Sequence, residues 1–489
     1  MPESKNADGA KLSKWLGLIG GIAVFAFMIS MAPPQGLSAR GWIVLSTGAL
    51  MTIFWFSEAI PATLTGLAPF LVLPLTGVMK SDQIAAAYFS PVLFLILGGF
   101  FLALAMEKWG LHRRIALFAL SRAAGGARSI LLAVMATTAL VSMFVTNSAA
   151  TLAMLPVAMA IIAATSPPNP DEAARAEHQR FGMALVLGIA YGATLGGFGT
   201  VIGSPGNAAS VAVFQKVYHR QISFNLWAAF GVPMVLLGVP FAWWLLSRFV
   251  FPFKLARLDS SAVRAAVGSP GPWSRTEIRL LLLLCGALAG WIGMPWLQRG
   301  IPGMSDAHVA LLTAISLFLV PSGSENEKHR SQALLIWDDT KLAPWHLLIL
   351  LGGGLAIAEA INATDLSQWL QAQFVGASSF SPLVQLAVLA LATLFVTEFV
   401  TNTATVSAFL PATVALAGSG QLDPVTLGMV TAFAANWGFM MPAGTPSLAL
   451  AYGTGYLTVP QMAYAGFFMD VAGVVLILGI VLGVGTIVL

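Results

Sequence analysis

Charged residues are scarce in this chain: only 9% of its 489 residues are Asp, Glu, Lys or Arg, against about 25% in ordinary soluble domains. Hydrophobic residues make up 57% of the chain. Apolar runs recur from Trp15 to the C-terminus, and runs of about 17 to 25 residues are long enough to cross ~30 Å of hydrocarbon as helices. The composition excludes a soluble fold and predicts an all-α polytopic protein of the cell (inner) membrane.

Cysteine is nearly absent. The single cysteine, Cys285, lies within "LLLLCGALAG", which excludes an internal disulfide and a paired-thiol metal site. The six histidines form no HExxH motif, and no nucleophile with a nearby base lies in the apolar runs, so an intramembrane enzyme and an organic cofactor are disfavoured. The net charge of +4 does not imply nucleic acid, because in a membrane protein the placement of Lys and Arg matters more than their sum.

Lysine and arginine are distributed unevenly over the connections between the apolar runs. If Lys5, Lys11 and Lys14 keep the N-terminus in the cytoplasm, the positive-inside rule assigns a side to each loop. Only five of the 24 basic residues then lie outside, and the other 19 face the cytoplasm; the external ones are Arg40, Lys80, Lys216, Arg220 and Arg299. This bias requires that two apolar regions with polar centres, 129–164 and 381–418, are re-entrant hairpins.

About eleven transmembrane helices then remain, and the C-terminus is expected to be external. The run 15–31 resembles a signal peptide but is long for one, so we interpret it as the first transmembrane helix. The expected spans are 15–31, 42–57, 62–79, 91–107, 181–218, 226–248, 276–297, 306–321, 345–361, 425–457 and 464–488.

The two hairpins carry the same polar cluster. "FVTNSAATLAMLP" (144–156) and "FVTNTATVSAFLP" (399–411) lie 255 residues apart. The same offset places Gly98 and Gly99 on Gly353 and Gly354. Farther along, "GGFGTVIGSPGN" (196–207) matches "WGFMMPAGTPSL" (437–448) at an offset of 241, because the first half has the longer polar loop. The pattern indicates an internal duplication.

The duplicated halves are predicted to be inverted, since 91–107 would run inward and its counterpart 345–361 outward. We divide the chain into an N-terminal segment with the first helix (1–41), a first repeat (42–250), a cytoplasmic linker (251–275) and a second repeat (276–489). Inverted repeats with interrupted helices are typical of secondary transporters with a site near the bilayer midplane. The alternatives are glycine pairs that only let helices pack closely, and a channel, which needs no matched halves.

The chemistry of the hairpin tips favours a cation and an anion together. One helical turn before each tip stand Ser142 and Thr397, and the Gly- and Pro-containing breaks at 202–206 and 443–447 free backbone carbonyls. Such neutral oxygens suit sodium, while helix N-termini attract an anion. No Lys or Arg lies between Arg128 and Arg175 or after Lys341, so bound cations would neutralise the anion.

Acidic residues in or near the apolar regions are further candidates by default. They are Glu107, Glu359, Glu398 and Asp470. For Glu398 and Asp470 a direct transport role and a hydrogen-bonded packing role both stay open.

The paired tips, the "GSPGN" and "GTPSL" breaks and the stretch "LGGFFLALAMEKWGLHRR" resemble the divalent anion/sodium symporter family. The resemblance covers nearly the whole chain after the first span. It implies a sodium-coupled carrier of succinate, malate, fumarate, citrate or sulfate. It also implies a homodimer in which a transport domain moves like an elevator against a scaffold domain.

The resemblance further implies two sodium sites and a substrate site. One sodium would be held by Ser142, Thr146, Asn147 and the backbone of Gly203, and the other by Thr397, Thr401, Asn402 and the backbone of Gly444. The substrate would meet Asn147, Ser148, Ser204, Pro205, Asn402, Thr403, Thr445 and Pro446. Thr146 and Thr401 replace the family's Ser, Ser148 replaces a Thr, and Leu448 replaces the expected Asn. Sodium-independent dicarboxylate exchange and symport of sulfate or another divalent anion therefore stay open as alternatives.

Overall fold

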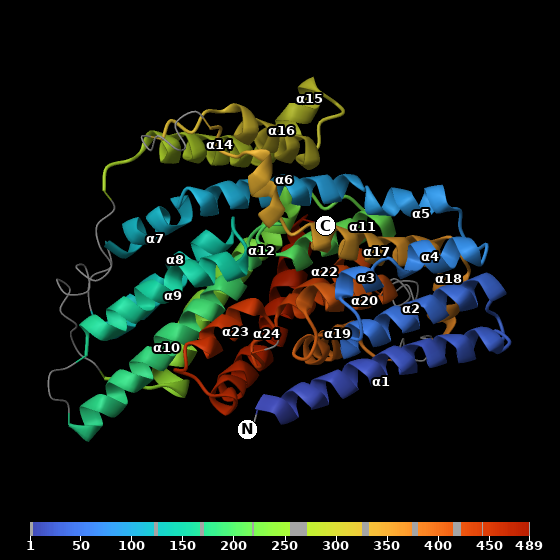
Figure 1. Ribbon diagram of the computed structural model, residues 1–489, viewed down its shortest axis with the longest axis horizontal. Coiled ribbons are helices and arrows are strands. Elements are labelled where there is room, and N and C mark those ends of the chain that lie inside the picture. The colour runs from blue at the N-terminus through green and yellow to red at the C-terminus, as the bar shows by residue number, and fades with distance from the viewer. Residues whose placement is uncertain are drawn as a thin grey trace. The chain divides into compact units, whose positions relative to one another are not determined.

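The computed structural model of the chain is helical (Figure 1). It describes residues 3–121, 126–166, 171–217, 220–254, 271–324, 332–373, 380–413, 422–442 and 444–488. Within these ranges the only β-type pairing is an isolated bridge between Pro321 and Ala333. The predicted all-α class is confirmed.

The chain folds into two compact units. The first unit comprises Met1–Phe94, Ala208–Ile222 and Pro344–Ala435, and the second comprises Leu95–Asn207, Ser223–Ala343 and Asn436–Leu489. Each unit takes segments from both predicted halves of the sequence. The inverted repeat itself stays a prediction.

In the first unit, α1 (Glu3–Ser30) runs beside α2 (Ala39–Ser57) (Figure 1). The helix α17 (Trp345–Asn362) packs against α2, α3 (Ala62–Thr65), α4 (Ala68–Leu75) and α5 (Ser81–Tyr88). Gly353 makes the closest approach, because a Cβ there would lie 2.1 Å from the carbonyl oxygen of Gly66. Glycine at 353 thus lets α17 press on the break between α3 and α4.

The segment predicted as one span over 62–79 is not a single continuous helix. This segment forms two short helices, α3 with 4 residues and α4 with 8. The chain turns at Gly66 and Leu67 between them, and Pro69 and Pro74 lack the backbone N–H groups of a continuous helix. The two helices together still form one apolar segment, Ala62–Leu75, and its crossing of the membrane stays a prediction.

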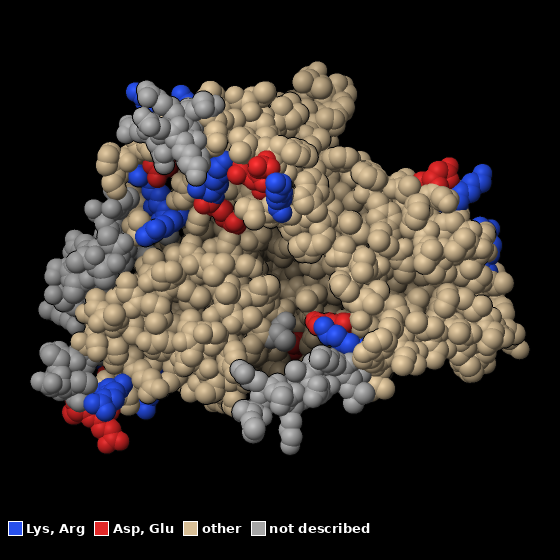
Figure 2. Space-filling view, in the orientation of Figure 1, with Lys and Arg blue, Asp and Glu red and all other residues tan. Residues whose placement is uncertain are grey.

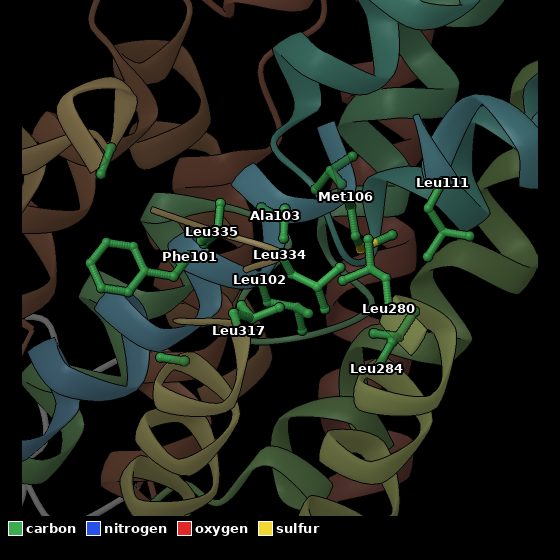
Figure 3. Packing of buried hydrophobic residues seen from close by; sticks show 14 of the residues in the cluster. Phe101, Leu102, Ala103, Met106, Leu111, Leu280, Leu284, Leu317, Leu334 and Leu335 are labelled. Carbon is green, nitrogen blue, oxygen red and sulfur yellow. The ribbon is translucent and has the colours of Figure 1, made fainter. Parts of the chain in front are cut away.

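An apolar core in the second unit joins α6 (Pro91–Lys108), α7 (Leu111–Ser121), α14 (Arg275–Ile292) and α16 (Asp306–Leu319). Figure 3 shows side chains of these helices and of the segment 334–335 pointing toward one another. The labelled ones are Phe101, Leu102, Ala103, Met106, Leu111, Leu280, Leu284, Leu317, Leu334 and Leu335. Beyond Ile292 the chain bends by 74° into α15 (Met294–Gly300).

Both predicted hairpins are pairs of helices joined by four-residue turns. The first consists of α8 (Ala127–Ser142) and α9 (Asn147–Ala164), in the second unit, and the other of α19 (Pro382–Thr397) and α20 (Asn402–Ala412), in the first unit. The arms α8 and α19 have 16 residues each, which is about 24 Å of helix. That is shorter than the hydrocarbon layer of ~30 Å, whereas α9, with 18 residues, is one of the helices long and apolar enough to cross; the re-entrant course of both hairpins stays a prediction.

The two predicted breaks are also present. The first separates α10 (Glu172–Gly197) from α11 (Pro205–Val217), and the second separates α22 (Pro424–Asn436) from α23 (Pro446–Gly453). The remaining helices are α12 (Phe224–Trp244) with the π-helix Leu245–Val250, the 3₁₀ helix Trp337–Leu342, α18 (Leu366–Gln373) and α24 (Val459–Val488).

Seven helices among the described residues are long and apolar enough to cross a membrane, or eight if the bent pair α14–α15 is one span. A multi-pass architecture follows. The expected number of about eleven crossings stays a prediction.

Candidate functional site

The first hairpin tip is a turn capped by its own side chains. The arm α8 ends at Ser142, and α9 begins at Asn147. Thr146 is the N-cap of α9, where its hydroxyl oxygen accepts a hydrogen bond from the Ala149 N–H (3.3 Å). Ser142 is buried, and Thr146, Asn147 and Ser148 are half-buried. The tip thus presents several partly buried oxygens.

Three oxygen atoms surround the Asn147 amide. Its inward end lies 2.8 Å from Ser142 Oγ and 3.2 Å from the carbonyl oxygens of Gly203 and Ala193. The Ser142 hydroxyl lies 2.8 Å from the Ala193 carbonyl oxygen and 2.8 Å from the Asn147 amide. With Nδ2 inward, the amide donates to the surrounding oxygens; with Oδ1 inward, it shares the Ser142 hydroxyl hydrogen with the Ala193 carbonyl, and the cluster of neutral oxygens suits a cation.

Gly197 makes room for this amide. A Cβ at position 197 would lie 2.5 Å from Asn147 Oδ1, closer than any real contact. The break that follows Gly197 is held by Asn207, whose Nδ2 donates to the carbonyls of Gly197 (2.6 Å) and Thr200 (2.8 Å). Thr200 in turn donates to the Met143 carbonyl and accepts from the Gly203 N–H. The first break is therefore fixed to the first tip.

The second part of this break contacts Asn436. Ser204 Oγ donates to Asn436 Oδ1 (3.4 Å) and accepts from the Gly206 N–H (3.3 Å). A Cβ on Gly206 would lie 2.1 Å from Asn436 Oδ1. Ser204 and Asn436 are buried, and Pro205 is half-buried as the first residue of α11. Asn436 thus holds the loop that carries Ser204 in place, through a hydrogen bond and close packing.

The second tip repeats the arrangement in the first unit. Thr397 ends α19, Asn402 begins α20, and Thr397 Oγ1 contacts both the Ala435 carbonyl oxygen and the Asn402 amide (3.0 Å). The Thr397 hydroxyl is thus shared between two acceptor oxygens, a cluster of neutral oxygens like that at the first tip. Thr401 is exposed and does not cap α20 with its side chain, whereas Thr403 is buried.

A pocket of about 280 Å³ opens beside the second tip, within the first unit. Thr401 lines it together with Lys14 of α1 and Glu58, the residue that follows α2. Glu58 adopts the left-handed conformation (φ 46°), which is uncommon outside glycine and is often found at functional sites. A basic side chain therefore lies near one of the two tips.

Comparisons with known proteins identify the family. The family model of the sodium:sulfate symporter transmembrane region matches residues 12–489. The chain belongs to this family. The predicted membership of the divalent anion/sodium symporters is confirmed, and the chain is a transporter and not an enzyme.

Curated relatives match this chain over nearly its full length. The sodium-dependent dicarboxylate transporter SdcS of Staphylococcus saprophyticus is 34% identical over 482 residues, which are 98% of this chain and 92% of the relative. SdcS of Staphylococcus aureus is 33% identical over 494 residues, covering 100% of this chain and 94% of the relative.

The chain also shares its fold with a solved structure. The crystal structure of the Alcanivorax borkumensis YdaH transporter matches with a TM-score of 0.52 and 15% identity, over 97% of this chain and 96% of the other. At this identity the likeness concerns the fold alone.

The predicted site residues of this chain fall into two groups. Ser142, Asn147 and Gly203 come together in the second unit, and Thr397 and Asn402 come together in the first. Gly444, Thr445 and Pro446 belong to the second unit, where Thr445 caps α23 by accepting from the Leu448 N–H (3.3 Å). The acidic candidates Glu398 and Asp470 are buried; their roles stay predictions.

Sequence reasoning missed several participants. The carbonyls of Ala193 and Ala435 leave no side-chain signal, and Asn436 has only Leu195 opposite it at the offset of 241. Lys14 comes from a distant part of the chain. Only Gly197 had a signal, since Gly438 is its counterpart in the repeat.

Proposed function

We propose that this protein is a secondary active transporter that imports small di- or tricarboxylates, of the succinate, malate, fumarate and citrate class, together with sodium. The names of the two SdcS relatives support both the substrate class and the sodium dependence. Their identity over nearly the full length supports carrying this function over to the chain.

One observation carries the proposal: the same trio occurs at both tips. Each trio has a hydroxyl at the end of the first arm, an asparagine at the start of the second arm, and a backbone carbonyl of a broken helix. The members are Ser142, Asn147 and the Ala193 carbonyl at the first tip, and Thr397, Asn402 and the Ala435 carbonyl at the second. Neutral oxygens of this kind suit a hard cation such as sodium. We assign one sodium to Ser142, Thr146, Asn147 and Gly203, and another to Thr397, Thr401, Asn402 and Gly444.

The asparagine amides offer a physical link between ion and substrate. Without sodium, Nδ2 of Asn147 is used on Ser142 Oγ and Gly203 O. When sodium binds, Oδ1 turns inward to meet the ion, and Nδ2 is released on the other side of the amide. A free N–H donor at the N-terminus of α9 favours a carboxylate, so sodium binding creates part of the substrate site.

The substrate carboxylates would contact both tips and both breaks. As the resemblance implies, we assign the substrate to Asn147, Ser148, Ser204, Pro205, Asn402, Thr403, Thr445 and Pro446. Sodium supplies most of the positive charge, because neither 129–164 nor 381–418 contains Lys or Arg. Lys14 adds charge beside the second tip.

We further propose that transport proceeds by an elevator motion within a homodimer, with the N-terminus cytoplasmic and the C-terminus external. The resemblance to the divalent anion/sodium symporters supports these features.

Transport driven by sodium alone tests the proposal. Purified protein in vesicles empty of dicarboxylate should accumulate labelled succinate when an inward sodium gradient is imposed. Potassium in place of sodium should abolish accumulation. Uptake that needs internal dicarboxylate instead of sodium would establish the second candidate, an exchanger, and sulfate competing better than succinate would redirect the substrate class.

Variants of the two asparagines test the sites. Asn147→Ala and Asn402→Ala should each lower the apparent sodium affinity about 10- to 100-fold, the size expected for losing a contact to a charged group. Asn225→Ala is the matched control, since Asn225 bonds the Ile292 carbonyl outside the hairpins. Unchanged sodium dependence in both tip variants would refute the site.

A further inference from the structure

A pocket of about 370 Å³ lies on the surface of the second unit, apart from both tips. Its walls come from α10, from the end of the π-helix that follows α12, and from the first turns of α24. The residues that matter here are Arg180, Met183, Phe251, Pro460, Gln461 and Tyr464. Nothing in the proposed transport mechanism uses these side chains.

The pocket lies where three apolar helices meet a polar boundary. The continuous buried stretch of α10 begins at Phe181, directly after Arg180, while the turns before it are charged. Figure 2 shows charged side chains gathered at the lower left, where Figure 1 places the start of α10. The π-helix ends at Val250, and α24 begins at Val459. These transitions mark the edge of the hydrocarbon layer, on the side predicted to be cytoplasmic.

The pocket carries positive charge that the protein does not neutralise. Arg180 is exposed and forms no ion pair within the described part of the chain, although Glu177 lies three residues before it on the same helix. The N-terminus of α24 contributes a partial positive charge. Gln461 accepts from the Thr458 N–H through Oε1 (2.9 Å), which directs its Nε2 donor elsewhere. An anionic group fits this set.

An apolar stripe leads away from the pocket along α24. Tyr464, Phe467, Val471 and Val475 are all exposed, with spacings of three and four residues that place them on one face. Beside this face, Phe249 of the π-helix packs edge-on against Phe468 of α24, with ring centroids 4.8 Å apart. A small soluble anion would use the pocket but leave the stripe unexplained.

We propose that this pocket binds the headgroup of an anionic phospholipid, with the phosphate at Arg180 and an acyl chain along the stripe of α24. Tyr464 suits the boundary because its ring is apolar and its hydroxyl polar. Basic pockets between transmembrane helices on the cytoplasmic side bind lipid headgroups by this chemistry.

Lipid binding to the purified full-length protein tests the proposal. In native mass spectrometry, phosphatidylglycerol should bind the wild type more tightly than phosphatidylcholine. Arg180→Gln should weaken phosphatidylglycerol binding about fivefold, the effect of one basic residue near a lipid surface. Arg180→Lys should retain most of it. The control is Arg175→Gln, an exposed arginine of α10 that does not line the pocket.

Three results would overturn the proposal. If Arg180→Gln binds phosphatidylglycerol as tightly as the wild type does, Arg180 does not hold the phosphate. If the wild type binds phosphatidylglycerol and phosphatidylcholine equally, the pocket does not recognise the charge of the headgroup. Inorganic phosphate could raise the melting temperature as much as phosphatidylglycerol does, which would exclude the acyl chain. Arg180 is exposed, so its variants should fold, and an unchanged melting temperature without lipid checks this.

Discussion

At the scale of single residues, the first tip depends on the missing side chain of Gly197. A Cβ there would lie 2.5 Å from Asn147 Oδ1. We expect Gly197→Ala to displace the amide and to raise the sodium concentration needed for half-maximal uptake about 10- to 100-fold. Helix propensity alone predicts the opposite, a gain of about 1 kcal/mol in stability. Sodium titrations of succinate uptake measure the effect.

The control for this substitution is Gly479→Ala, a helical glycine of α24 with nothing within 4 Å of its would-be Cβ. It should transport like the wild type. If Gly197→Ala also keeps the wild-type sodium titration, the Asn147 amide is not confined as the structure indicates, and its role at the ion site fails with it.

The sequence predicted the hydroxyl and amide members of each trio, because their spacing of five residues recurs at both tips. It could not predict the carbonyls, since every residue carries one and only folding selects which of them faces the amide. Asn436 was missed for another reason. It holds the Ser204 loop in the first break, whereas the comparison of repeats looks only for residues that occur twice.

At the scale of elements, breaks and hairpins were predicted where their residues cannot continue a helix. Prolines and glycines interrupt α10–α11 and α22–α23 as expected. The segment 62–79 is divided into α3 and α4, which hydropathy did not predict because mean hydropathy ignores Gly66, Pro69 and Pro74. The two breaks also differ in a way that the sequence shows. In the first break, the Asn207 amide donates hydrogen bonds to two backbone carbonyls, whereas Leu448 at the matching position of the second break has no side-chain donor.

An ion pair fixes α7 to the start of α14. Arg114 Nη1 donates to both Glu277 carboxylate oxygens (3.2 and 3.1 Å), and its guanidinium lies 4.3 Å from the Trp273 ring centre. Glu277 also caps α14 through Ser274. Because the pair is largely buried, we expect Arg114→Gln to cost about 1–3 kcal/mol, measured as a lower melting temperature of the purified protein.

The neighbouring Arg113→Gln is the control, because Arg113 is exposed and forms no ion pair within the described ranges. Glu277→Gln should destabilise as well, and the double variant with Arg114→Gln should lose less than the sum of the two. Equal melting temperatures for the Arg113 and Arg114 variants would show that the pair does not hold the two helices together.

At the scale of the whole molecule, the two trios belong to different compact units. Segments of each unit are separated widely along the chain, so hydropathy and repeats reveal the parts but not their grouping. The paired hairpins nevertheless constrain the membrane topology of the whole chain. A hairpin returns the chain to the side it came from, whereas a crossing reverses every later loop.

Cysteine labelling tests this condition, because Cys285 is the only cysteine and Cys285→Ser gives a background without thiols. Arg113→Cys and Arg175→Cys flank the first hairpin, and Ser381→Cys and Asp423→Cys flank the second; all four positions are exposed. A membrane-impermeant maleimide applied to intact cells should label both positions around the second hairpin and neither around the first, until the membrane is permeabilised. Flanks of one hairpin on opposite sides would make that segment a crossing and remove its tip from the proposed site.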